Sequence, residues 1–153
     1  MKLERTFDAD LIRSVVGHPE IKPLVLESED VPVPMHDSIY YFKAIEERIA
    51  DGAVEDVLIG IVAFMPVNNI SWNPHICVLP EHRGKGTEVM RLAVEWMFSN
   101  TPCAKVVAFP PAFNKPMVRV FEKCGFRLEG ISPKSFLWHG ELHARFLMGM
   151  EKK

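Results

Sequence analysis

Alternation of apolar and polar positions divides the chain into segments with the period of a strand and segments with the period of a helix. Residues 3–7 have a strand-like pattern, and Asp8 or Asp10 can cap a helix that runs through Val16, because a carboxylate accepts the free backbone donors of a first helical turn. Residues 19–37 hold four of the twelve prolines and an acidic run, which predicts an irregular, exposed loop.

Residues 38–51 carry apolar side chains at three- and four-residue steps, which is the spacing of an amphipathic helix. The positions that define this spacing are Ile39, Phe42, Ile45 and Ile49. The segment is therefore predicted as a helix that ends near Asp51-Gly52.

The residues that follow are typical of buried strands. Val54–Val67 is a nearly continuous β-branched and apolar run, and Ile70–Leu79 pairs with it through the Asn68-Asn69 turn as a predicted antiparallel hairpin. Five further segments complete the pattern, and the alternation of strands and helices predicts an α/β fold without internal repeats. They are a helix over Thr87–Phe98, a strand over Lys105–Phe109, a helix over Asn114–Lys123, and strands over Phe126–Ile131 and Leu142–Met150.

Length and charge restrict the function classes. The 153 residues fit one domain, and a formal net charge of −2 gives no general attraction for nucleic acid or an anionic membrane. No apolar run reaches the length of a membrane span, and the N-terminal residues lack a signal-like stretch, so we expect a cytoplasmic protein. Cys77, Cys103 and Cys124 lie far apart among apolar neighbours, which indicates reduced core thiols rather than disulfides or a metal site.

The segment His75–Thr87 passes from a strand through a basic, glycine-containing turn directly into a helix. Glycines allow the backbone to approach an anion, and the first turn of a helix presents unpaired N–H groups and the positive end of its dipole. Arg83 and Lys85 add charge at the same place. A phosphate or diphosphate is the ligand that suits this arrangement, and a flexible turn without a ligand is the alternative.

Two motifs in this part of the chain resemble those of the Gcn5-related N-acetyltransferases (GNAT). The pattern Val-x-Pro-x-x-Arg-Gly-x-Gly is matched by Val78, Pro80, Arg83, Gly84 and Gly86. Residues 114–130 look like the second motif, an Asn followed by a helix and Glu-Lys-x-Gly-Phe, and residues 138–150 are similar to the closing hairpin of the ribosomal-protein N-acetyltransferase branch. The resemblance implies a single domain over residues 1–153, with a mixed, mostly antiparallel sheet of six to seven strands flanked by about four helices.

The same resemblance implies that acetyl-coenzyme A is the cosubstrate. The strand backbone around Ile76 and Val78 would lie beside the pantetheine arm, and Asn114 would lie near that arm as well. Residues 83–88 would hold the diphosphate, and their members are Arg83, Gly84, Lys85, Gly86, Thr87 and Glu88.

Two positions depart from the family pattern. Glu88 replaces a small residue and would repel a diphosphate unless its side chain turns away. Phe121 stands where the family often has a tyrosine that protonates the leaving thiolate, and a phenyl ring has no proton to give.

The general base is not evident either. His75 is a candidate, but it points to the strand face opposite Val78 unless a bulge intervenes, and a histidine without a chemical role is the alternative. His36, Tyr40 and Tyr41 can form a substrate lip or serve only in packing. No metal site is predicted.

The leading interpretation is an acetyl-coenzyme A-dependent N-acetyltransferase that acts on a protein N-terminus or a small-molecule amine, as a monomer or homodimer. It predicts no nucleic-acid or membrane partner. The alternative, motivated by Glu88 and Phe121, is a GNAT-fold protein that has lost its chemistry and acts as a binding or assembly component, for example in phage virion assembly.

Overall fold

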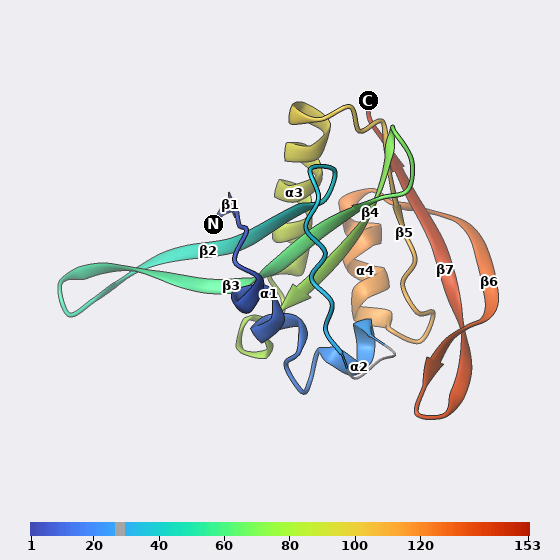
Figure 1. Ribbon diagram of the computed structural model, residues 1–153, viewed down its shortest axis with the longest axis horizontal. Coiled ribbons are helices and arrows are strands. Elements are labelled where there is room, and N and C mark those ends of the chain that lie inside the picture. The colour runs from blue at the N-terminus through green and yellow to red at the C-terminus, as the bar shows by residue number, and fades with distance from the viewer. Residues whose placement is uncertain (27–29) are drawn as a thin grey trace.

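The central sheet has seven strands in the order β1-β2-β3-β4-β5-β7-β6 (Figure 1). The computed structural model describes residues 1–26 and 30–153. Neighbouring strands are antiparallel except β4 and β5, which run parallel, so the predicted mostly antiparallel α/β sheet is confirmed. The strands are β1 (Lys2–Arg5), β2 (Tyr40–Ala50), β3 (Ala53–Pro66), β4 (Ser71–Val78), β5 (Lys105–Ala108), β6 (Arg127–Trp138) and β7 (Glu141–Glu151).

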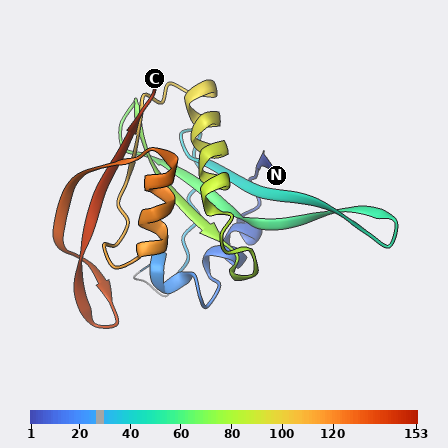
Figure 2. The same cartoon turned by 180° about the vertical axis from the view of Figure 1, so that it is seen from behind.

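Helices cover both faces of this sheet. Two of them, α3 and α4, lie next to each other over one face (Figure 2), while α1 lies on the other (Figure 1). No helix among the described residues is both long enough and apolar enough to cross a membrane. The helices are α1 (Ala9–Val16), α2 (Lys22–Val25), α3 (Gly86–Asn100) and α4 (Lys115–Cys124), with a short 3-10 turn, η1 (Pro80–His82).

The core consists of one apolar cluster on each face. The larger cluster joins strand residues such as Phe64 to Met90 of α3 and Phe121 of α4, and the smaller one joins Ile12 of α1 to Ile61 of β3. The three cysteines are buried and free, which confirms their prediction as reduced core thiols. Burial raises the pKa of the Cys77 thiol to about 12, so this thiol is not a nucleophile at neutral pH.

The helix predicted over residues 38–51 is wrong, because this segment forms strand β2. Neighbouring side chains of β2 are buried on both faces: Tyr41 packs in the smaller cluster and Phe42 in the larger. A β-bulge shifts the register between Ala44 and Ile45. Two-sided burial and the bulge together replace simple alternation with three- and four-residue steps, which imitate the period of a helix.

Two tight turns with positive φ join neighbouring antiparallel strands. Asp51 and Gly52 both have positive φ, of 50° and 78°, and form the turn of the β2–β3 hairpin rather than a helix end. His139 and Gly140 repeat this geometry between β6 and β7, which confirms the predicted closing hairpin. The segment 19–37, predicted as irregular, contains the one-turn helix α2, and its residues 27–29 lie outside the described residues.

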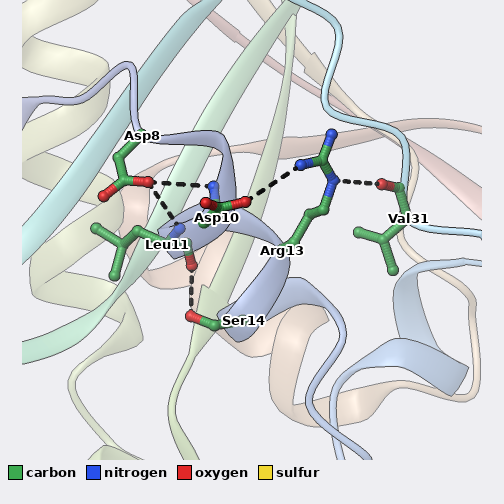
Figure 3. Close-up of polar contacts among 6 residues, drawn as sticks. All are labelled: Asp8, Asp10, Leu11, Arg13, Ser14 and Val31. Atoms are coloured by element: carbon green, nitrogen blue, oxygen red, sulfur yellow. Dashed lines mark hydrogen bonds and ion pairs between the residues drawn. The ribbon is translucent and has the colours of Figure 1, made fainter.

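Asp8 is the residue that caps α1 (Figure 3). One of its carboxylate oxygens accepts hydrogen bonds from the backbone N–H groups of Asp10 and Leu11, each at 3.1 Å. Arg13, one turn later, pairs with Asp10 at 3.6 Å and donates through Nε to the carbonyl of Val31 at 3.4 Å. These contacts hold the start of α1 and connect the helix to the chain that leads into β2.

We expect Asp8→Ala to lower the free energy of unfolding by about 1 kcal/mol, because two backbone donors lose their acceptor. Asp10→Ala is the matched control, since Asp10 lies in the same turn but makes only an exposed ion pair, and it should change stability by less than about 0.5 kcal/mol. Urea denaturation of the three proteins measures both effects. Equal losses in the two variants would contradict the role of Asp8 as the cap.

Candidate active site

A slot opens in the sheet because β4 and β5 pair over only two positions. Ser71 lies opposite Lys105 and Trp72 opposite Val106, after which the strands separate. Just beyond β5 the chain still lies beside β7, where the N–H of Phe146 donates to the carbonyl of Pro110 at 2.9 Å. One wall of the slot is therefore the free edge of β4, and the other is the segment after β5, which β7 supports.

The backbone groups of β4 alternate between its two edges. The N–H of Leu79 donates to the carbonyl of Ile59 in β3. Because backbone groups alternate along a strand, the N–H of every second residue before Leu79 also faces β3. The amides of Ile76 and Val78 therefore point to the opposite edge, into the slot. Pro74, which also faces this edge, has no N–H to leave unpaired. The predicted contact of this strand with an extended ligand thus has two free donors to support it.

The slot contains a cavity of about 130 Å³ with a mostly apolar lining. Leu24 and Val25 of α2 close one side, and Met117 and Phe121 of α4 lie on another. The polar side chains in the lining are Asn73, His75, Asn114 and Arg145.

Asn114 lies in the wall of the slot, and its place beside the coenzyme arm stays a prediction. Its side-chain oxygen caps α4 by accepting from the N–H of Met117 at 3.4 Å. The amide nitrogen of Asn114 has no partner among the residues that the structure describes, so it is free to donate to a ligand.

Phe121 is 3 % exposed and belongs to both the larger core cluster and the lining of the slot. Its ring lies 4.9 Å from that of Phe126, measured between ring centroids. Within the described part of the chain, the slot is lined by no hydroxyl or thiol group that could replace the missing tyrosine as a proton donor.

His75 lines the slot from β4. The register between β3 and β4 is continuous, so no bulge turns His75 toward the face of Val78, and the opposite-face prediction holds. The side chain reaches the cavity because β4 has a free edge there. Surrounding protein lowers the pKa of the imidazole below 6.5 by desolvation, although the side chain remains exposed to water at the mouth of the slot. His75 is therefore neutral at neutral pH and able to accept a proton.

The turn between β4 and α3 presents several free backbone donors. Among the described residues, no acceptor is found for the N–H groups of Gly84, Gly86, Thr87 and Glu88. Gly84 has φ of 99°, a conformation that favours glycine. Gly86 permits close packing, since a Cβ there would lie 3.3 Å from a methyl group of Val120 in α4. The donors and the helix dipole make this turn suitable for an anion.

Both basic side chains of the turn are already paired with carboxylates. Arg83 donates to Glu20 at 3.0 Å, and Lys85 donates to Glu46 of β2. The hydrogen bond from Lys85 lowers the pKa of Glu46 below its usual value. These pairs hold the two cations beside the turn, where they can exchange a carboxylate for a bound anion.

Glu88 lies in the first turn of α3 with its side chain exposed. It does not line the slot, and no ion pair of Glu88 is found in the described part of the chain. The carboxylate therefore lies outside the slot, although its charge remains in the turn that carries the free donors.

The three residues of the predicted substrate lip do not line the slot. Tyr41 is 3 % exposed, and its hydroxyl donates to the carbonyl of Pro34 at 2.9 Å. Tyr40 packs against Trp72 and Trp96 on the other face, and the ring of His36 contacts Ser38. Their role at a substrate lip stays a prediction.

Sequence reasoning did not identify Arg145 and Asn73 as residues of the slot. Each lies in a segment predicted as a strand, but no motif marked either position. Only the separation of β4 from β5, and the return of β7 beside the segment after β5, place these side chains in one cavity. No cluster of three metal-binding side chains is found among residues 1–26 and 30–153.

Comparisons with known proteins agree with this geometry. Residues 8–127 match the family model described as an acetyltransferase (GNAT) domain. No curated protein sequence matches the chain.

The fold is similar to solved structures of spermidine N-acetyltransferase from Vibrio cholerae. A complex with CoA and spermine is 21 % identical with a TM-score of 0.78, and covers 98 % of this chain and 94 % of that one. A mutant form of that enzyme has the same TM-score at 20 % identity, with coverage of 99 % and 95 %. A dodecameric form is 25 % identical with a TM-score of 0.63, and covers 75 % of this chain and 66 % of that one. The ribosomal-protein branch stays a prediction.

We expect Gly84→Ala to destabilise the protein by about 1–2 kcal/mol, because its backbone conformation disfavours a side chain while the surrounding space is open. Gly52→Ala is the matched control, since Gly52 also has positive φ and open surroundings but lies in the distant β2–β3 turn. Urea denaturation should give losses of the same order for both. A Gly84→Ala protein as stable as the wild type would show that this turn does not require a left-handed residue.

The lowered pKa of His75 predicts a pH dependence of stability. Below pH 6.5 the unfolded chain binds a proton at this position more readily than the folded chain, so folding loses stability as the pH falls from 6.5 toward the folded pKa. The stability difference between the wild type and His75→Gln should therefore shift in favour of the variant between pH 7.5 and 5.5. NMR titration of the imidazole, assigned by comparison with the variant, measures the pKa directly, and a value of 6.5 or more would contradict the prediction.

Proposed function

The chain belongs to the acetyltransferase (GNAT) family, and from this membership we propose that it transfers an acetyl group from acetyl-coenzyme A to the nitrogen of an amine. The observation that carries the proposal is the free edge of β4, where the amides of Ile76 and Val78 face an apolar slot. This edge continues into the turn whose unpaired N–H groups suit a diphosphate. An extended ligand with a diphosphate at one end and a thioester at the other matches both parts.

In this proposal the pantetheine arm pairs with β4, as an added strand would, at Ile76 and Val78. The amides of residues 83–88 bind the diphosphate, with Arg83 and Lys85 supplying charge in exchange for their carboxylate partners. Asn114 donates its free amide nitrogen to the arm from the α4 side of the slot.

The reaction needs an uncharged amine next to the thioester carbonyl. The amine nitrogen forms a bond to the carbonyl carbon, and the charge that develops on the oxygen is stabilised by a free N–H of β4. Breaking the C–S bond then releases coenzyme A and leaves the amide product. Alignment of the two reactants in the slot supplies much of the acceleration.

Proton transfer is assigned to His75 and solvent. The neutral imidazole at the mouth of the slot accepts the proton that the amine loses, directly or through a water molecule. Phe121 cannot protonate the leaving thiolate, so that proton comes from water or from the attacking amine itself.

No observation favours the alternative of an assembly protein without chemistry. That reading rested on Glu88 and Phe121, and Glu88 is exposed and outside the lining of the slot. Phe121 removes one proton donor but leaves the slot and the anion-binding turn intact.

We expect acetyl-coenzyme A at 100 times its Kd to stabilise the protein by about 2.7 kcal/mol, which raises the melting temperature.

Glu88→Gln removes a carboxylate from the turn and keeps a side chain of nearly the same size. The Kd for acetyl-coenzyme A should therefore fall by about two- to fivefold, as expected for one charge near a helix N-terminus. Thermal melting and calorimetric titration measure these effects.

Glu122→Gln is the matched control, because Glu122 is an exposed carboxylate of α4 that does not line the slot. Its Kd for acetyl-coenzyme A should equal that of the wild type. The proposed function is wrong if millimolar acetyl-coenzyme A neither stabilises the wild type nor gives a measurable heat of binding.

A further inference from the structure

We propose that the acceptor amine carries a carboxylate a few bonds from its nitrogen, and that Arg145 binds this carboxylate. The inference deepens the proposed function and rests on it. It concerns the wall of the slot opposite β4, which no family motif reaches.

Arg145 is held in place by three contacts. Its Nε donates to the hydroxyl of Ser135 at 3.3 Å, and its guanidinium carbon lies 5.8 Å from the centroid of the Phe109 ring. Its backbone forms a bridge with Pro111, in the segment that makes this wall. The side chain is half-buried and lines the cavity. These contacts hold the side chain in place, and Nε is the only guanidinium nitrogen that they use.

The two Nη groups of Arg145 remain available. Within residues 1–26 and 30–153, no carboxylate pairs with this guanidinium, in contrast to Arg83 and Lys85. A half-buried guanidinium without a counter-charge gains a charge-assisted partner when a carboxylate binds to it. The planar pair of Nη donors matches the two oxygens of a carboxylate.

Charge in the rest of the slot supports the same assignment. Among the described lining residues there is no Asp or Glu, and Arg145 is the only one with a permanent charge. His75 adds no charge at neutral pH, because its pKa is lowered. A polyamine would therefore meet a cation in this cavity and no carboxylate in the described lining. An acceptor amine with its own carboxylate would instead pair that carboxylate with the charge of Arg145.

Such an acceptor has an amine and a carboxylate, and the two walls of the slot offer one side chain for each. His75 lies on the β4 wall and Arg145 on the β7 side of one cavity of about 130 Å³. An acceptor held by its carboxylate at Arg145 presents its amine toward β4, where the thioester is proposed to lie. Free α-amino acids and peptides with an N-terminal Asp or Glu share this chemistry.

The test compares acceptors that differ only in the carboxylate. Acetyl transfer from acetyl-coenzyme A is measured with L-leucine, L-leucinamide and 3-methylbutylamine, with Asp-Ala and Ala-Ala peptide amides, and with spermidine, and each kcat/KM is corrected to the uncharged amine. We expect a carboxylate-bearing acceptor to exceed its neutral counterpart and spermidine by about tenfold or more, the value of a hydrogen-bonded charge pair. L-leucine and the Asp-Ala peptide amide distinguish a free amino acid from a peptide N-terminus.

Variants of Arg145 locate the effect. Arg145→Met should reduce the preference for carboxylate-bearing acceptors to about twofold or less, and Arg145→Glu should reverse it in favour of spermidine. Arg145→Lys keeps the charge but loses the paired donors, so it should retain an intermediate preference and serves if the other variants fold poorly. Arg127→Met is the matched control, since Arg127 is an exposed arginine of β6 outside the slot, and its preference should be that of the wild type.

Several results overturn the inference while leaving the proposed function intact. They are a spermidine rate equal to or above the best carboxylate-bearing acceptor, binding of acetyl-coenzyme A without transfer to any such acceptor, and an unchanged preference in folded Arg145→Met. A loss of acetyl-coenzyme A affinity in Arg145→Met with unchanged acceptor preference would assign the residue to the coenzyme instead. Absence of acetyl-coenzyme A binding in the wild type is a failure of the proposed function and not of this inference alone.

Discussion

The separation of β4 from β5 after two paired positions is the constraint on which the site depends. A strand inside a sheet normally satisfies its backbone on both edges, so an open edge leaves donors that need another partner. Two features make the opening stable. The segment after β5 is hydrogen-bonded to β7, which prevents it from returning to β4, and Pro74 removes one of the donors at the open edge. The donors that remain, at Ile76 and Val78, are those a pantetheine-like ligand would use.

The turn after β4 has no surplus of positive charge, so an anion would bind there by replacing the carboxylate partners of its two basic side chains. Arg83 and Lys85 are each neutralised by a carboxylate from another part of the chain, Glu20 and Glu46. The Arg83–Glu20 pair is exposed and the Lys85–Glu46 pair is partly exposed. Exposed ion pairs contribute about 0–1 kcal/mol, so releasing such pairs costs little compared with charge-assisted bonds to a diphosphate. The turn can therefore remain nearly neutral without ligand and still bind an anion. This agrees with the small net charge of the whole chain.

The sequence predicted local structure well where one physical cause acts alone. The basic turn and the α3 helix follow from backbone donors and glycine, and both have the predicted place. The helix predicted over Asn114–Lys123 also forms, and the structure adds that Asn114 is its cap. The helix predicted over residues 38–51 failed because burial on both faces and a bulge act together on β2. Asp51-Gly52 was the signal that could have corrected it, since this dipeptide favours a hairpin turn.

The sequence predicted residues of the slot on β4 and at the start of α4, but none on the β7 side. The β4 wall carries its motif within a single stretch of chain, so spacing reveals it. Arg145 becomes part of the site through the return of β7, about seventy residues later in the sequence, and long-range pairing leaves no local period to read.

The absence of a tyrosine at Phe121 affects only one of the two proton transfers in acetyl transfer. A thiolate is a good leaving group because its conjugate acid has a pKa near 8.5, so it can depart before a proton arrives. The attacking amine, in contrast, must be uncharged to react, and most amines are protonated at neutral pH. In the proposed mechanism, a neutral His75 at the mouth of the slot acts on that step by removing a proton, and Arg145 on the other wall acts on it by orienting the nitrogen. In this proposal the chain has groups that deprotonate and orient the amine. It lacks the proton donor for the thiolate, which can leave without one.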